Sequence, residues 1–137
     1  MFAKIKSLFE KPDFGKLLIR IGFGITFIAL GIPKLAGGVD KWTGIGAAMA
    51  KIGLPLEAFY PAFGLAAALA EFLGGIAILI GFGFRTACFF LCFTMIVAAA
   101  TQVGGDPWFQ VLWPASMAFY FLGAMFMGPG SISVQKG

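Results

Sequence analysis

The sequence predicts an all-α integral membrane protein, a four-helix bundle formed by one domain over residues 1–137. The first observation is composition: 60% of the residues are hydrophobic and 12% are charged, whereas soluble domains are nearer half apolar and a quarter charged. The second is size, because a chain this short cannot hide so large an apolar excess in one core. The third is four apolar runs, each close to the roughly 20 residues that cross a bilayer as a helix.

Turn and cap residues separate the four runs. Gly81 and Gly83 form a tight link, so the second and third spans are predicted to be antiparallel neighbours. Asp106 as N-cap and Pro107 as first helical residue predict the start of the fourth span. The predicted spans are residues 15–36, 56–81, 86–103 and 108–127.

Two shorter segments are predicted outside the spans. Residues 1–12 place Phe2, Ile5 and Phe9 on one side of a helix, away from the lysines. This segment is therefore either an amphipathic helix in the headgroup plane or a disordered end. Residues 44–52 repeat apolar side chains at helical spacing and stop at Gly53. We expect a short interfacial helix there, on the outer surface between spans one and two.

Lysine and arginine near the span ends predict the orientation. With four spans, the two chain ends and Arg85 share one side, and this side collects most of the basic residues. The other side holds Lys41 and Lys51, with Lys34 at its border. We therefore expect both termini in the cytoplasm. The tryptophans fall near the opposite face, as an interfacial aromatic belt would.

The chain lacks the residues that several kinds of active site require. The chain has no histidine, which excludes histidine-ligated haem, most zinc and copper sites and a Ser-His-Asp triad. Cys88 and Cys92 are interpreted as small packing residues, with a copper(I) or redox pair as the alternative. No nucleotide loop or metal cluster is present. We expect no metal and no covalently bound cofactor, and the net charge of +4 favours contact with anionic lipid over nucleic acid.

Two ionisable side chains lie well inside the predicted spans. Glu71 is about 15 Å from the inner end of span two, and Arg20 is roughly 7–8 Å inside span one. An extended arginine covers most of that difference, so we predict a buried Arg20–Glu71 ion pair. In the alternative, Arg20 extends to the inner surface and Glu71 is protonated. The pair would either fix the register of two helices or serve proton transfer or polar ligand binding.

Polar and aromatic side chains near the outer ends of the spans suggest a second feature. If the helix faces that carry them meet, they line a cavity that opens outward and that a quinone could enter. The alternatives are that the lysine extends to the outer interface and that hydrogen bonds merely hold the bundle together. The candidate cavity residues are Lys34, Tyr60, Gln102, Gln110 and Trp113.

Several short motifs, in this order and spacing, resemble the DoxX family over nearly the whole chain. They are Leu17-Leu-Ile-Arg20, Gly31-x-x-Lys34-Leu35, Gly53-Leu-Pro55, Glu71-x-x-Gly74-Gly75, Gly81 through Arg85, and Gly128-Pro-Gly130-Ser131. The resemblance implies a four-span protein of a bacterial or archaeal cytoplasmic membrane. It also implies that Arg20, Lys34, Glu71 and Arg85 occupy the family's polar positions.

The resemblance also implies a function class. Some DoxX-like proteins are membrane subunits of thiosulfate:quinone oxidoreductases, and others partner with soluble thiol-stress or oxygen-stress enzymes. We expect a membrane subunit that supports an oxidoreductase complex, binding a quinone or anchoring a soluble partner, without a redox centre or catalysis of its own. The alternatives are a small transporter or lipophile carrier that uses Arg20 and Glu71, and a purely structural or assembly subunit. Beyond lipid, the expected partner is an oxidoreductase or a second copy of the chain.

Overall fold

The computed structural model describes residues 2–133, so the two ends of the predicted 1–137 domain lie outside it. Every regular element in the described range is helical. Four helical segments are long and apolar enough to cross a membrane, which confirms the predicted all-α bundle. In chain order the elements are α1 (Phe2–Phe9), α2 (Pro12–Ala36), α3 (Gly38–Gly46), η1 (Ala47–Ile52), η2 (Glu57–Phe59), α4 (Tyr60–Ile80), α5 (Phe84–Gln102), η3 (Trp108–Val111) and α6 (Leu112–Met127).

Two helix starts differ in detail from those expected, one in position and one in its capping residues. Helix α2 begins at Pro12 instead of residue 15. The N–H of the first helical residue has no partner within the helix, so a proline, which has no N–H, is favoured at that position. The fourth span begins at Trp108, as predicted, but the capping roles predicted for Asp106 and Pro107 are wrong. Pro107 is extended, with ψ at 151°, and the fourth span opens at Trp108 as a 3-10 turn. The proline ring fixes φ alone, and this φ suits both a helix and an extended chain.

Helices α2 and α4 pack with their backbones close together. A Cβ added at Gly24 would lie 3.0 Å from the carbonyl oxygen of Gly75, and one added at Gly31 would lie 2.9 Å from the backbone nitrogen of Phe72. Small residues allow such close approach between helices in hydrocarbon, where van der Waals packing holds them. These contacts fix which residues of α2 and α4 lie at the same level.

The main core lies where α5 packs against α6 and α2. Cys88, Leu91 and Met95 of α5 are fully buried there, together with Phe27 and Phe121. The two phenylalanine rings meet edge to face, with centroids 5.3 Å apart, a geometry that aromatic pairs favour. One face of α5 is therefore committed to the core, and its other face is available to line a cavity.

We expect the native cysteines to resist thiol reagents. Cys88 and Cys92 are both buried, and the Cys92 thiol contacts the carbonyl oxygen of Ala118 at 3.4 Å. A maleimide should label them at least about a hundredfold more slowly than a cysteine placed by Ser7→Cys on exposed α1, because reaction requires local opening. Labelling in detergent followed by mass spectrometry measures this. Equal rates would contradict the described packing of α5.

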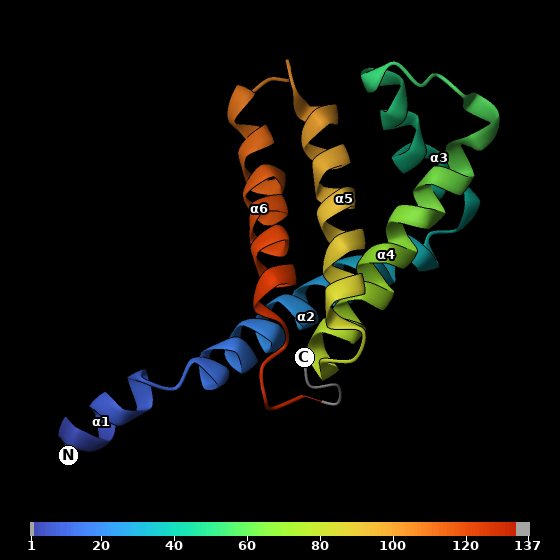
Figure 1. Cartoon of the computed structure of the whole chain (residues 1–137). Coiled ribbons are helices and arrows are strands. Elements are labelled where there is room, and N and C mark those ends of the chain that lie inside the picture. The colour runs from blue at the N-terminus through green and yellow to red at the C-terminus, as the bar shows by residue number, and fades with distance from the viewer. Residues whose placement is uncertain (1, 134–137) are drawn as a thin grey trace.

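The bundle is splayed at one end. We call the end with the α4–α5 link and the last residues of α6 the Arg20 end, and the opposite end the Lys34 end. Figure 1 shows α5 and α6 side by side, while α4 diverges from them toward the Lys34 end, where α3 lies against α4. The single helix predicted over residues 44–52 is instead α3 followed by the 3-10 turn η1. These two elements occupy the space that the divergence of α4 opens.

Helix α1 stands apart from the bundle. Residues 2–9 form a helix that projects away from the other elements in Figure 1. The side chains of Phe2 and Phe9 are more than four-fifths exposed. Of the two states expected for residues 1–12, residues 2–9 thus adopt the helical one, and the described part of the chain leaves Phe2 and Phe9 uncovered.

Candidate functional site

Glu71, a buried carboxylate of α4, is paired with a lysine. Lys34 Nζ lies 2.7 Å from Glu71 Oε2, and Glu71 is only 5% exposed. The predicted Arg20–Glu71 pair is therefore wrong. Gly31 of α2 packs against Phe72 of α4, so Lys34, about one turn beyond Gly31, reaches Glu71 at the same level of the bundle.

Arg20 has a different environment, in which its hydrogen-bond partners among residues 2–133 are all backbone carbonyls. It is 2% exposed, and its guanidinium donates hydrogen bonds to the carbonyl oxygens of Ile78, at 3.0 Å, and Leu79, at 2.9 Å. It also donates to the carbonyl oxygens of Pro129 and Ile132. The last carbonyls of a helix lack intrahelical donors and carry partial negative charge, so they can satisfy a buried guanidinium without any carboxylate. Arg20 thereby ties the end of α4 to the segment after α6.

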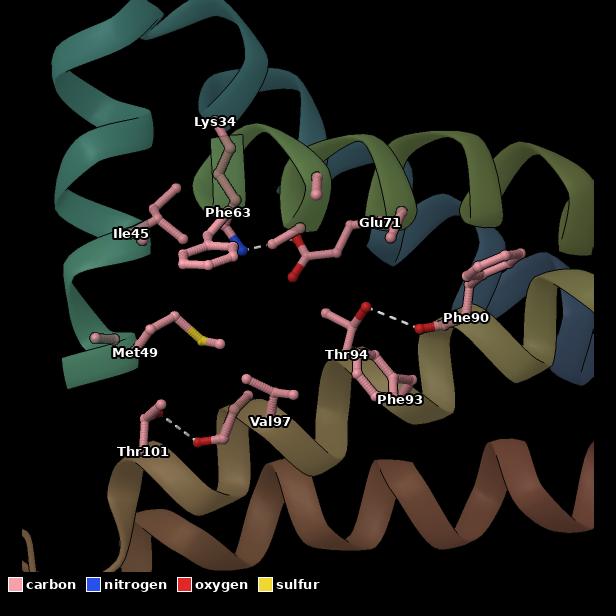
Figure 2. A pocket seen from close by; sticks show the side chains of 16 residues that line it. Lys34, Ile45, Met49, Phe63, Glu71, Phe90, Phe93, Thr94, Val97 and Thr101 are labelled. Carbon is pink, nitrogen blue, oxygen red and sulfur yellow. Dashed lines mark hydrogen bonds and ion pairs between the residues drawn. The ribbon is translucent and has the colours of Figure 1, made fainter. Parts of the chain in front are cut away.

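A cavity of about 450 Å³ lies between α4, α5 and the α3–η1 segment. Its walls are largely apolar, and Figure 2 shows Ile45 and Met49 on one side, Phe63 and Glu71 on another, and a stripe of α5 side chains below. The lining residues are Lys34, Ile45, Gly46, Ala48, Met49, Phe63, Ala66, Ala67, Ala70, Glu71, Phe90, Phe93, Thr94, Val97, Ala98 and Thr101.

The Lys34–Glu71 pair supplies the charge of this cavity. Among the residues that line it, these two alone are charged, and Figure 2 shows both head groups pointing into the open space. The hydroxyls of Thr94 and Thr101 are used within α5, where they donate to the carbonyl oxygens of Phe90 and Ala98. A side-chain hydrogen bond donated to a ligand here would therefore come from Lys34, whereas the threonine oxygens can only accept.

The pair retains capacity for further hydrogen bonds. A lysine ammonium has three donors, and Lys34 donates to Glu71 Oε2. The second carboxylate oxygen of Glu71 receives no hydrogen bond from the part of the chain that the structure describes. The cavity can thus offer both a donor and an acceptor to one small head group without breaking the pair.

Only one of the five predicted cavity residues lines the cavity. Lys34 does; Tyr60, Gln102, Gln110 and Trp113 do not. The α6 ribbon lies beyond α5 in Figure 2, on the far side from the cavity, so the faces of the second and fourth spans do not meet. Trp113, on α6, is 55% exposed.

The residues that the prediction missed carried a recognisable pattern. Phe90, Thr94 and Val97 follow helical spacing, so they share one face of α5. Alanines of α4 face them, and their small side chains leave open space between the helices, which is the cavity. In sequence, such residues look the same as lipid-facing and packing residues, and only the divergence of α4 from α5 separates them.

The α3 helix is attached firmly beside the pair. The indole N–H of Trp42 donates to the carbonyl oxygen of Lys34 at 2.9 Å. The backbone of α3 touches that of α4 at two glycines, Gly46 against Tyr60 and Gly64 against Trp42. This attachment positions Ile45 and Met49 as the wall opposite α5.

These features define a class: a multi-pass α-helical membrane protein with a cavity between its spans and one ion pair in the cavity wall. No group of three or more histidine, cysteine, aspartate or glutamate residues suited to a metal ion occurs in residues 2–133. The DoxX family model matches residues 15–104, well over half of the chain, so the chain belongs to the DoxX family. No curated protein and no solved structure matches it.

The family match covers the cavity but not the whole bundle. Lys34, Glu71 and all other cavity-lining residues fall within residues 15–104. Helix α6 and the motif Gly128-Pro-Gly130-Ser131 lie beyond it. The cavity is thus built entirely from the segment that places the chain in the family.

Proposed function

We propose that the protein is a membrane subunit that supports an oxidoreductase complex by holding a quinone, or a ligand with a similar apolar body and carbonyl head, in the α4–α5 cavity. It lies in a bacterial or archaeal cytoplasmic membrane with both termini in the cytoplasm. The observation that carries the proposal is an apolar cavity with a single ion pair in its wall. Pockets for small ligands typically combine apolar walls with a few placed polar groups.

The size and chemistry of the cavity support this ligand class. A volume of about 450 Å³ lies within the roughly 300–1,000 Å³ that ligand sites span. Phe63, Phe90 and Phe93 offer ring surfaces to an aromatic or quinoid body. The remaining donors of Lys34 suit a carbonyl oxygen, and the second oxygen of Glu71 suits the hydroxyl of a reduced quinol.

A supporting role fits the residues better than independent catalysis. Among the cavity-lining residues there is no cysteine, and the chain has no histidine. Electrons delivered to or taken from a bound quinone would therefore pass through a partner protein. Lysines on and after α1 and Arg85 at the α4–α5 link give the Arg20 end the positive charge that favours the cytoplasmic side.

Filling the cavity should abolish binding of a quinone. Ala70 lines the cavity on α4, whereas its neighbour Leu69 does not and is 38% exposed. We expect Ala70→Phe to weaken binding of a short-tail ubiquinone analogue at least about tenfold, because the ring occupies the ligand's space, while Leu69→Phe on the same helix changes it less than about twofold. Isothermal titration calorimetry in nanodiscs measures both. No binding by the native protein, or equal losses in the two variants, would overturn the proposal.

A lipophile carrier is the second candidate. Phe90 and Phe93 line the cavity and are also more than half exposed on the chain surface, so an apolar ligand could enter sideways from the bilayer. Movement of a labelled lipophile between vesicles distinguishes the two candidates, because a supporting subunit binds the ligand without transferring it.

A further inference from the structure

We infer that the cavity selects a neutral polar head group and rejects an anionic one on the same tail, and that Glu71 determines this choice. The inference rests on the proposed function, because it specifies which apolar ligands the same cavity accepts. It would make the protein a binder of quinones, quinols or alcohols within a membrane that also contains many anionic amphiphiles.

The first step is the charge balance of the cavity. Lys34 and Glu71 are the two charged residues among those that line it, and they lie 2.7 Å apart. Their charges cancel at the scale of a bound head group. The other lysines of the same end, Lys41 and Lys51, are exposed and do not line the cavity. The cavity lining therefore has no net positive charge that would attract an anion.

The second step is what an anionic head group would meet. Because Lys34 already pairs with Glu71, a second carboxylate or sulfonate would have to share the ammonium and lie close to the Glu71 carboxylate. Like charges a few ångströms apart repel strongly where water is scarce. The anion would also lose its hydration without gaining a counter-ion of its own. A neutral carbonyl or hydroxyl oxygen can accept a hydrogen bond from Lys34 without repulsion by Glu71 and without losing the hydration of an ion.

The third step is the effect of removing the Glu71 charge. The side chain of Glu71 is 6% exposed, against 29% for that of Lys34, so the carboxylate is held beside the ammonium in the cavity wall. Removing its charge would leave the partly buried ammonium without a counter-ion in a largely apolar cavity, which is unfavourable. An incoming anion would then complete the pair that Glu71 now makes.

The test compares two amphiphiles with the same tail. Dodecan-1-ol and dodecane-1-sulfonate are used to displace a short-tail ubiquinone analogue from the protein in nanodiscs of neutral lipid, with displacement followed by calorimetry. In the native protein we expect the alcohol to act at a concentration at least about tenfold lower than the sulfonate. In Glu71→Gln we expect the sulfonate to gain, relative to the alcohol, by more than this native ratio, so that the order reverses.

Two further variants complete the design. Glu57→Gln removes an exposed carboxylate from η2 outside the cavity and should keep the native order. The double variant Lys34→Gln with Glu71→Gln has no charge in the cavity and should again prefer the alcohol. It also tests the inference if the single Glu71 variant does not fold. Any preference of the native protein or the double variant for the sulfonate would sink the inference.

The same data distinguish a failure of the proposed function from a failure of the inferred selectivity. If the native protein binds neither the ubiquinone analogue nor the alcohol, the proposed function fails. If it binds the analogue but both amphiphiles displace it equally, ligand binding stands and the inferred selectivity is wrong. An unchanged order in a folded Glu71→Gln variant would remove Glu71 as the determinant.

Discussion

Replacing Arg20 with methionine should lower the free energy of unfolding by about 3–5 kcal/mol, since a buried group that loses its charged partner costs far more than an exposed one. Methionine keeps most of the apolar stem but leaves four carbonyl oxygens, on Ile78, Leu79, Pro129 and Ile132, without their donor. Arg20 is 2% exposed, so water can replace only part of the lost hydrogen bonding. Unfolding in mixed detergent micelles, followed by tryptophan fluorescence, measures the loss.

Neighbouring Lys16 provides the control. Its ammonium donates to the Met127 carbonyl oxygen at 3.4 Å in an exposed position, so Lys16→Met should cost less than about 1 kcal/mol. Arg20→Lys should be intermediate, because an ammonium lacks the planar fork that reaches carbonyls on two segments at once. If Arg20→Met and Lys16→Met unfold alike, Arg20 does not hold the α4 end to the segment after α6.

Arg20 and Glu71, which we predicted to form one ion pair, have separate environments in the structure. Arg20 satisfies backbone carbonyls at the Arg20 end, away from the cavity lining, which is a stabilising role. Glu71 and Lys34 lie in the cavity wall, where a ligand can reach them. Loss of Arg20 should therefore reduce stability first, whereas loss of the Glu71 charge should change ligand preference. A purely structural subunit would show only the first effect.

The fold could be predicted from the sequence because hydrocarbon leaves the chain little choice. A backbone in lipid must satisfy its own hydrogen bonds, so an apolar run of span length becomes a helix. The four spans follow from run length, and the breaks follow from residues such as Gly81 and Gly83, both of which adopt positive φ. These signals are local, and sequence reasoning uses local signals well.

The ion pair could not be predicted because it depends on how two helices slide past each other. Arg20 and Lys34 are both on α2, and depth alone favoured the former as the partner of Glu71. The Gly24 and Gly31 contacts set the actual register, placing Lys34 beside Glu71 and Arg20 beside the end of α4. The sequence shows that these glycines can approach a neighbour but not which residue they approach.

The cavity was missed for a similar reason. The prediction assumed that polar residues of α6 face α4, whereas α6 packs behind α5. Four apolar helices can pack beside one another in several arrangements, and the hydrophobic pattern of the sequence does not distinguish among these arrangements. Lys34 was a candidate because a lysine at a span end can extend to the interface or turn toward a ligand, and its depth does not decide between the two.

Placing a methyl group at Gly64 should separate α3 from α4. A Cβ there would overlap the Trp42 carbonyl oxygen, so Gly64→Ala should cost about 2–3 kcal/mol, the range for overpacked contacts that the backbone must relieve. Gly22 of α2 and Gly44 of α3 provide matched controls, because a Cβ at either meets nothing within 4 Å. Alanine there should leave stability unchanged or raise it by up to about 1 kcal/mol, since glycine is the weaker helix former.

The same substitution should also damage the cavity, which links the packing of α3 to binding. Ile45 and Met49 form the wall opposite α5, and Trp42 bonds the carbonyl oxygen of Lys34. If α3 is displaced, that wall moves and the indole bond breaks, so Gly64→Ala should weaken binding of the ubiquinone analogue at least about tenfold. Calorimetry on Gly64→Ala and Gly44→Ala in the same nanodiscs measures this, at a temperature where both are folded. A Gly64→Ala variant that keeps native affinity would show that α3 is not part of the binding wall.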